Sequence, residues 1–385
     1  MIIIRVLDKR KSTFDLVGLG APSATSSALC GGFCYGDNII NSSLGQYSES
    51  IEIRDKFTPK KINNNLLYNS YYRQHLKYSN TPLENIYFNK AQRVLSCGSY
   101  LIFAHEIDEY GEIAEKGKLH KANFCKDRLC PMCSWRRSYK IFGQVSQIME
   151  QIHGGYKFLF LTLTVPNVSK EELNSAIDHL MSSWNRFTGY KPIKKILRGY
   201  FRALEITYNK ESNTFHPHFH IVLAVPLSYF SSRDYLSRDD FLELWRKATR
   251  NASITQVDIR VCKDKYSKDE LNSQKFLSSA VAEVAKYAVK SSDYLLDDEQ
   301  LTDELVEVFS SALLHRRLVQ FGGIFKEVFK KLRLDDAESD DADLVHINDK
   351  LNPSLSWLIC RYGWSMGAYQ LIGSYVETAD KHLKN

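Results

Sequence analysis

Three histidines fall within five residues, in the run His216-Pro-His218-Phe-His220, directly before the apolar residues 221–225. The chain has 11 histidines in 385 residues, so chance is a poor explanation of this cluster. Successive side chains of an extended strand alternate between its two faces, which places the three imidazoles on one face. Neutral imidazoles side by side are a metal-ligand arrangement, so we predict a metal site. The simpler alternative is the solvent-facing polar edge of a half-buried strand.

A carboxylate can complete this ligand set. Residues 200–208 are typical of a second strand, in which Glu205 lies on the opposite face from its neighbours Leu204 and Ile206. If the two strands pair as a hairpin, Glu205 lies beside the histidine row. Two imidazoles and one carboxylate with open positions suit a divalent ion that also holds a phosphate oxygen. The alternative for Glu205 is an exposed strand carboxylate.

A third group of polar residues lies on a predicted helix over residues 275–293. With about 100° per residue, Glu283, Tyr287, Lys290 and Tyr294 gather within about 60° on one flank. A tyrosine can attack a phosphodiester, and a nearby lysine can favour the phenolate or offset charge in the transition state. Glu283, one turn before Tyr287, could activate a water or hydroxyl for a second transfer. On its own, such a set is more typical of an exposed helix surface.

Cysteine spacing predicts a second metal site. Cys125, Cys130 and Cys133 supply three thiols at short spacing in a chain that we expect in a reducing compartment. A structural zinc site needs four ligands, so one must come from elsewhere. Cys97 is the first choice and His120 the competing candidate. Buried free cysteines are the alternative to a metal site.

Basic residues suggest where a polyanion would bind. Arg136 and Arg137 follow Cys133, the last cysteine of this cluster, and could contact DNA phosphates. Between residues 186 and 202 there are basic and aromatic side chains but no acid, and from this segment we take Lys194, Lys195 and Arg198 as candidate DNA-binding residues. The formal net charge of +6 is too small to prove such a partner by itself. A solvated loop is the alternative for the second segment.

The elements that must position these residues follow from periodicity and capping signals. We predict helical character around residues 66–76, a strand over residues 158–165, and a helix that opens at the capping box of residues 169–172. After the two strands of the hairpin come a helix from Ser237, a strand over 254–262 and the helix over 275–293. This order predicts an α+β domain with a mainly antiparallel sheet.

We divide the chain into four parts. These are residues 1–90 of open role, 91–150 with the cysteines, 151–335 with the histidine run and the polar helix flank, and 336–385 as an acidic connection and a C-terminal segment. Residues 335–343 form the acidic stretch and are expected to be solvated. The first apolar run is too short for a secretory signal, and no run approaches 18 apolar residues, so we expect a cytoplasmic protein with no membrane partner.

Taken together, the motifs make the chain similar to the plasmid rolling-circle replication initiators (Rep proteins) of the HUH endonuclease superfamily. The resemblance covers residues 90–335 and rests on three motifs in family order: residues 160–164, the histidine run, and Glu283-x3-Tyr287-x2-Lys290. It implies that residues 151–335 are an HUH endonuclease domain, an antiparallel sheet flanked by helices, with a zinc-binding element at residues 91–150 on its N-terminal side. It implies that His218 and His220, with His216 and Glu205 as further candidates, bind Mg²⁺ or Mn²⁺. It also implies that Tyr287 nicks one DNA strand to leave a 5′-phosphotyrosine and a free 3′-hydroxyl, and that Glu283 helps to terminate the reaction.

The partners implied by this resemblance are double- and single-stranded origin DNA, a host helicase and a host polymerase. The similar initiators carry a cysteine in a place comparable to that of Cys97. Two alternatives stay open. An HUH transposase or relaxase would use the same chemistry, although relaxases usually place the tyrosine before the histidines. A non-catalytic, zinc-stabilised nucleic-acid-binding protein belongs to a different class, and metal-dependent nicking of supercoiled DNA would separate it from an enzyme.

Overall fold

Two antiparallel sheets with flanking helices make up the described part of the chain. The structure is a computed structural model that describes residues 53–262, 281, 285, 288–347 and 351–379. The larger sheet has the order β6-β3-β5-β4-β7. Its strands are β3 (Tyr156–Thr164), β4 (Gly199–Asn209), β5 (Thr214–Pro226), β6 (Asp258–Val261) and β7 (Val319–Gly323). The predicted α+β class and antiparallel pairing are therefore confirmed.

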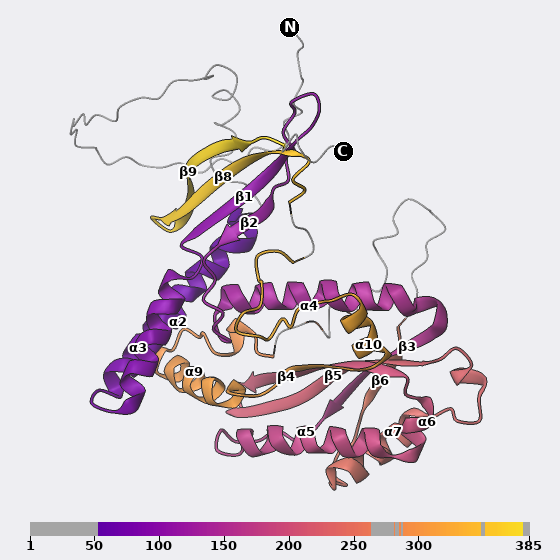
Figure 1. Cartoon of the computed structure of the whole chain (residues 1–385). Helices are drawn as coiled ribbons and strands as arrows, with labels where there is room; N and C mark the ends of the chain where they lie inside the picture. Colours follow the sequence, from indigo (N-terminus) through magenta and orange to yellow (C-terminus); the bar gives the residue numbers. More distant parts are fainter. Residues whose placement is uncertain (1–52, 263–280, 282–284, 286–287, 348–350, 380–385) are drawn as a thin grey trace, which may run out of the picture. The chain divides into compact units, whose positions relative to one another are not determined.

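The larger sheet is covered on both faces, because the side chains of its central strands are apolar on both. Leu159, Leu161 and Leu163 of β3 share a core with helix α5 (Leu173–Gly189). Phe158 and Phe160 point to the other face and pack in a core with helix α4 (Pro131–Ile152) and α10 (Ile324–Lys331). Figure 1 shows α4 and α5 on opposite sides of the sheet.

A second sheet joins residues far apart in the sequence. It has the order β2-β1-β8-β9, formed by β1 (Tyr100–Ile107), β2 (Lys118–Ala122), β8 (Ser356–Ser365) and β9 (Ala368–Glu377). The C-terminal segment, for which the sequence predicted no element, therefore completes a sheet that begins near the cysteines. Strand β8 pairs with β1 along the whole length of β1, from Tyr100 opposite Gly363 to Ile107 opposite Ser356, and β9 pairs with β8.

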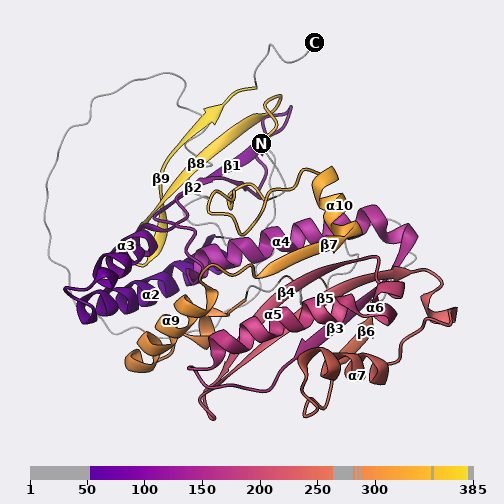
Figure 2. The ribbon, with the colours of Figure 1, turned by 60° about the horizontal axis from the view of Figure 1, so that its bottom comes forward.

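Helices α2 (Thr58–Lys77) and α3 (Pro82–Ser96) pack side by side as a hairpin (Figure 2). Helix α2 also contacts α9 (Glu299–Leu313), where Arg73 Nε lies 2.7 Å from Asp303 Oδ2. The remaining elements are α6 (Lys191–Ile196), α7 (Arg238–Thr249), the π-helical turn η2 (Ile53–Phe57) and the 3-10 turns η3 (His153–Gly155), η4 (Tyr229–Ser231) and η6 (Ser291–Asp293). No helix in the described ranges has the length and apolar character needed to cross a bilayer.

Most predicted elements are present, with shifted ends. Helix α7 begins at Arg238, with Ser237 and Asp240 as its capping box. Helix α5 begins only at Leu173, because the Ser169 amide donates to the Glu172 carboxylate while no side chain caps the helix itself. The strand predicted over residues 254–262 is limited to β6.

The prediction of a helix over residues 275–293 is wrong at its C-terminal end, and most of the rest lies outside the described residues. Lys290 has extended dihedral angles, with φ −80° and ψ 144°, and a 3-10 turn follows it. The cause is a tertiary hydrogen bond: the Ile206 amide of β4 donates to the Ala288 carbonyl at 2.7 Å. A backbone bonded to a neighbouring strand in this way has left the helical ladder.

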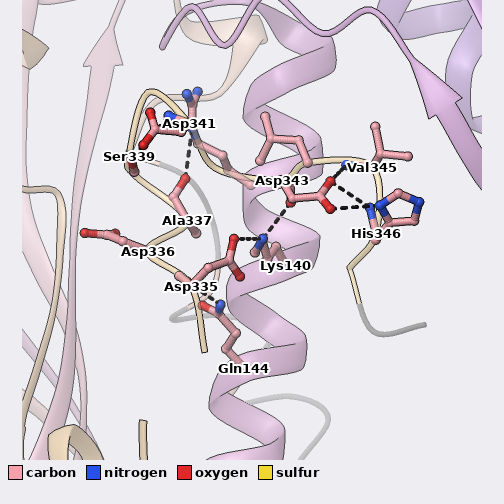
Figure 3. Close-up of polar contacts among 12 residues, drawn as sticks. Lys140, Gln144, Asp335, Asp336, Ala337, Ser339, Asp341, Asp343, Val345 and His346 are labelled. Atoms are coloured by element: carbon pink, nitrogen blue, oxygen red, sulfur yellow. Dashed lines mark hydrogen bonds and ion pairs between the residues drawn. The ribbon is translucent and has the colours of Figure 1, made fainter. Parts of the chain in front are cut away.

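The acidic stretch is packed against α4 and is not simply solvated as predicted. Lys140 of α4 pairs with the Asp335 carboxylate and donates to the Asp343 carbonyl at 2.6 Å, and Gln144 donates to the Asp335 carbonyl at 2.8 Å (Figure 3). Glu338 accepts from the Leu318 amide at 3.0 Å. These contacts arise because α4 presents long polar side chains whose donors need acceptors once they are buried.

Candidate active site and metal centres

The β4–β5 hairpin brings the predicted ligands together. Glu205 lies directly opposite His218, and Ala203 lies opposite His220. Residues paired in this way project from the same face of an antiparallel sheet. That face is the one covered by α4, because Val222 and Ala224 continue the histidine row into the α4 core. All three ligand candidates are buried, with Glu205 only 3 % exposed.

The donor atoms of these residues converge. His220 Nε2 lies 2.8 Å and His218 Nε2 3.5 Å from Glu205 Oε2, and the two imidazole nitrogens are 3.2 Å apart. Among the described residues, Glu205, His218 and His220 form one of two groups whose ligand atoms are close enough to hold a metal ion. Two nitrogens and one carboxylate oxygen are a suitable donor set for a divalent ion with open positions.

Contacts behind the imidazoles fix their orientation. His218 Nδ1 lies 3.0 Å from the His216 carbonyl, which can only accept, so His218 carries a proton on Nδ1 and turns Nε2 towards His220 and Glu205. His220 Nδ1 lies 3.2 Å from Thr162 Oγ1 of β3. Such contacts commonly hold metal-binding histidines in place. Thr162 was missed as a functional residue, although its position in the alternating strand motif of residues 160–164 could have indicated it.

His216 lies outside this group, contrary to the prediction that it is a further ligand. It is one pair further along the strand, opposite Thr207, and its ring stacks on His218 with 4.9 Å between centroids. Burial first, and then the neighbouring His218, lower the pKa of His216. Its contribution to the site is its carbonyl oxygen and its ring contact with His218.

Lys290 reaches the same carboxylate from a different part of the chain. Its Nζ lies 3.0 Å from Glu205 Oε1. Burial would raise the pKa of Glu205, but hydrogen bonds from His218, His220 and Lys290 outweigh it and lower this pKa. Glu205 is therefore an anion that binds imidazoles through one oxygen and an ammonium through the other.

The other two members of the predicted catalytic set, Glu283 and Tyr287, lie outside the described residues. Tyr294, the alternative nucleophile, is 1 % exposed and donates its hydroxyl proton to the Leu129 carbonyl. Because Lys290 and Tyr294 do not share a helix, the predicted flank does not exist at its C-terminal end. Tyr294 is a core residue, and the structure removes it as a candidate.

Four cysteines form the second candidate metal group, and Cys97 is among them as predicted. Sγ of Cys97 lies 3.5 Å from that of Cys133 and 3.5 Å from that of Cys130, and Sγ of Cys125 lies 3.7 Å from that of Cys133. Four thiolates around a zinc ion, with Zn–S bonds of about 2.3 Å, would have their sulfurs about 3.8 Å apart. These spacings fit a tetrahedral metal site and are too long for disulfides. The competing candidate His120 lies outside the group.

The surroundings of the cysteines suit negatively charged sulfur. Amides of Cys125, Lys126 and Asp127 donate to cysteine sulfurs at 3.2 to 3.4 Å. The buried ammonium of Lys61 donates to the Cys97 carbonyl at 2.8 Å and brings a positive charge beside the group. A buried cation of this kind requires compensating negative charge, which a metal-bound tetrathiolate would supply.

Arg136 and Arg137 do not have the exposed position predicted for DNA contacts. Arg136 donates to the Leu344 and Val345 carbonyls, both at 2.8 Å. Arg137 is 1 % exposed and donates to the carbonyls of Lys126, Asp127 and Ala337. The sequence shows their charge but not the main-chain carbonyls that cover them, so both are packing residues.

Three of the predicted DNA-binding residues remain accessible. Lys194 and Lys195 on α6 and Arg198 after it are exposed. Lys195 Nζ lies 2.7 Å from Asp234 Oδ1, and Arg198 donates to the Lys195 carbonyl at 3.0 Å. Exposed ion pairs of this type are weak and can be exchanged for contacts with phosphates.

Comparison with known proteins places the chain among replication proteins. A family model described as "Replication protein" matches residues 116–367. A protein of Bacillus sp named "Protein rep" is 40% identical over 275 residues, covering 69% of this chain and 87% of the relative. "Protein rep" of Bacillus amyloliquefaciens is 39% identical over 274 residues (69% and 78%), and that of Staphylococcus aureus is 35% identical over 246 residues (63% and 96%). No solved structure matches the chain.

Proposed function

Because this chain belongs to the replication protein family, we propose that it is a plasmid rolling-circle initiator that nicks one DNA strand at the origin. The observation that carries the proposal is the convergence of Glu205, His218 and His220 with Lys290 bonded to Glu205. In this proposal the larger sheet is of the HUH type. Each of the three motifs that suggested the family resemblance contributes a described residue with a contact in this group: Thr162, the two histidines and Lys290.

His218, His220 and Glu205 would hold Mg²⁺ or Mn²⁺ in this proposal. Bound there, the ion would supply Lewis-acid polarisation of a phosphate oxygen. Thr162 and the His216 carbonyl keep both imidazoles turned towards Glu205. The burial of this carboxylate keeps water from competing for it.

Tyr287 is the proposed nucleophile, on the grounds of its spacing from Glu283 and Lys290. Its phenol oxygen would form a bond to the phosphorus while the bond from phosphorus to the 3′ oxygen breaks. The phenol loses its proton and the leaving oxygen gains one, giving a 5′-phosphotyrosine and a 3′-hydroxyl. The ammonium of Lys290 favours the phenolate, and Glu283 would activate the attacking group in the terminating step.

The cysteine group is proposed to hold a structural Zn²⁺, because tetrathiolate sites without an open position are typical of structural zinc. Lys194, Lys195 and Arg198 are proposed to contact origin DNA. The free 3′-hydroxyl would pass to a host polymerase, with a host helicase opening the duplex, which places the reaction in the cytoplasm.

The test is nicking of a supercoiled plasmid that carries the replication origin at which this protein acts. The wild-type chain should convert it to the open circle only with a divalent ion. The double variant His218→Ala, His220→Ala should bind the same DNA but leave it supercoiled. Origin binding without nicking by the wild-type chain would refute the proposal and favour a non-catalytic DNA-binding protein.

A further inference from the structure

A cleft of about 370 Å³ lies beside Lys290, between α4 and a wall that includes Ala285, Val289 and Ser291. Its wall on α4 consists of side chains three or four residues apart: Ser134, Trp135, Ser138, Tyr139 and Phe142. This spacing makes them one continuous helix face. A cavity of this size is within the usual range for small-ligand sites.

The two sides of α4 differ in how they are covered. Arg137 and Lys140 are buried against the acidic stretch, and Arg136 is buried against the carbonyls of Leu344 and Val345, which follow it. On the cleft side, Tyr139 is 52 % exposed and Trp135 is half-buried. Large aromatic side chains left open beside a candidate active site suggest a ligand surface.

The aromatic wall is held in place from behind. The Phe57 ring meets the Trp135 ring edge-on, with 5.0 Å between centroids. The Arg136 guanidinium lies 5.5 Å from the Trp135 ring centre and 5.9 Å from that of Tyr139. These contacts limit the movement of both rings, so a ligand that stacks on them loses little side-chain entropy.

Charge indicates what kind of ligand fits. Lys60 and Lys290 line the cleft, and no acidic side chain does so among the described residues. A larger cleft between α2 and α9, of about 870 Å³, is different, because four acidic side chains line it: Glu299, Asp303, Glu304 and Glu307. The cleft at Lys290 therefore suits an anion with flat apolar faces.

The cleft and the histidine site are on the same side of the larger sheet. Ile141 and Val145 of α4 pack in one core with Val222 and Ala224, which continue the histidine face of β5. Lys290 belongs to both places, since it lines the cleft and contacts Glu205. A DNA strand whose phosphate lies at the histidines can therefore extend into the cleft.

We propose that this cleft is a subsite for the bases of single-stranded DNA next to the nicked phosphate, a step that rests on the proposed function. Trp135 and Tyr139 stack with bases, while Lys60 and Lys290 contact phosphates. The helix rises about 10 Å from Trp135 to Phe142, which is enough for two or three bases stacked about 3.4 Å apart. The serine hydroxyls can bond to base edges and so select among them.

The experiment uses the full chain and a fluorescein-labelled oligothymidylate of about 10 nucleotides. Tyr139→Ala should weaken binding by about tenfold, the loss expected for one stacked base. Trp135→Phe, which keeps a ring, should weaken it less. The matched control is Tyr110→Ala, since Tyr110 is 83 % exposed on a different surface, and it should bind like the wild type.

Circular dichroism checks that the Tyr139→Ala and wild-type chains are both folded. Equal affinity of these two chains for the probe would overturn the cleft proposal. A wild-type chain that does not bind the probe would overturn it as well. A second readout replaces one thymidine by 2-aminopurine, whose fluorescence should be quenched by the wild type and less so by Tyr139→Ala. Nicking of origin plasmid is measured in parallel. Wild-type binding of the probe without any nicking would refute the proposed function and leave the cleft as a DNA-binding site.

Discussion

At the residue scale, Glu205 is where the site's charges meet. Both of its oxygens are engaged, one by imidazole nitrogens and the other by the Lys290 ammonium, in a nearly closed environment. Interactions of this kind are stronger than on the surface because water screens them less. A substitution that removes only the charge therefore affects both the metal site and the position of Lys290.

Glu205→Gln tests this role. The amide keeps the shape but is a poorer metal ligand and does not pair with an ammonium, so nicking should fall by roughly 100-fold or more. Raising the Mn²⁺ concentration should restore part of the activity if metal affinity is what was lost. A variant with wild-type metal dependence would show that Glu205 is not a ligand.

Thr162→Val tests the support behind His220. The change keeps the side chain's shape and removes the hydrogen bond to His220 Nδ1, so the Mn²⁺ concentration at half-maximal nicking should rise about 10- to 100-fold. Thr188→Val is the control, because that hydroxyl donates only to carbonyls of its own helix, α5. An unchanged Mn²⁺ requirement in Thr162→Val would remove Thr162 from the site.

At the element scale, the two-residue period of a strand and the pairing of β4 with β5 explain what could be predicted from the sequence. Strict alternation in β4 and β5 predicted that Glu205 and the histidines share a face, and the register confirms it. The helix predicted through Lys290 failed because periodicity does not detect the hydrogen bond between Ile206 and Ala288. The positions of Arg136 and Arg137 could not be predicted, since their acceptors come from residues 126–127, 337 and 344–345.

The structural role of α4 leads to a prediction that separates packing from DNA binding. Arg137→Met leaves three buried carbonyls without their donor and should destabilise the fold by roughly 3 kcal/mol or more. Thermal unfolding measures that loss. For folded protein at lower temperature, the dependence of origin binding on salt should be unchanged.

Lys194→Ala should behave in the opposite way. Stability should hardly change, because Lys194 is exposed, while the slope of log affinity against log salt should fall by about one. If Arg137→Met reduced the salt slope and Lys194→Ala did not, the assignment of these two residues would have to be reversed.

At the scale of the whole molecule, the cysteine group lies between α3 and α4, in a region that the C-terminal strand β9 also contacts. Cys97 follows α3 and Cys133 lies in the first turn of α4. The C-terminal strand β9 supports the same region, since the buried Tyr369 hydroxyl donates to the Gly98 carbonyl at 2.6 Å. No sequence signal linked residues 356–377 to this site, because pairing between distant strands depends on the complete fold.

Loss of the proposed zinc should therefore unfold more than a local loop. Cys130→Ser should abolish metal retention and cost on the order of 10 kcal/mol, comparable to the stability of a whole domain. Elemental analysis of the wild type should give about one zinc per chain. A wild-type preparation that is stably folded without zinc would show that the cysteines pack as free thiols.

The proposed function requires the Glu205, His218 and His220 site to direct Tyr287 to a DNA phosphate. Peptide mapping by mass spectrometry tests this, by identifying the tyrosine linked to DNA after Mn²⁺-dependent reaction with the origin strand. We expect a single modified peptide with the 5′ phosphate on Tyr287, absent in Tyr287→Phe and in the His218→Ala, His220→Ala double variant. A 5′ phosphate on any other tyrosine, or nicking without a covalent adduct, would contradict it.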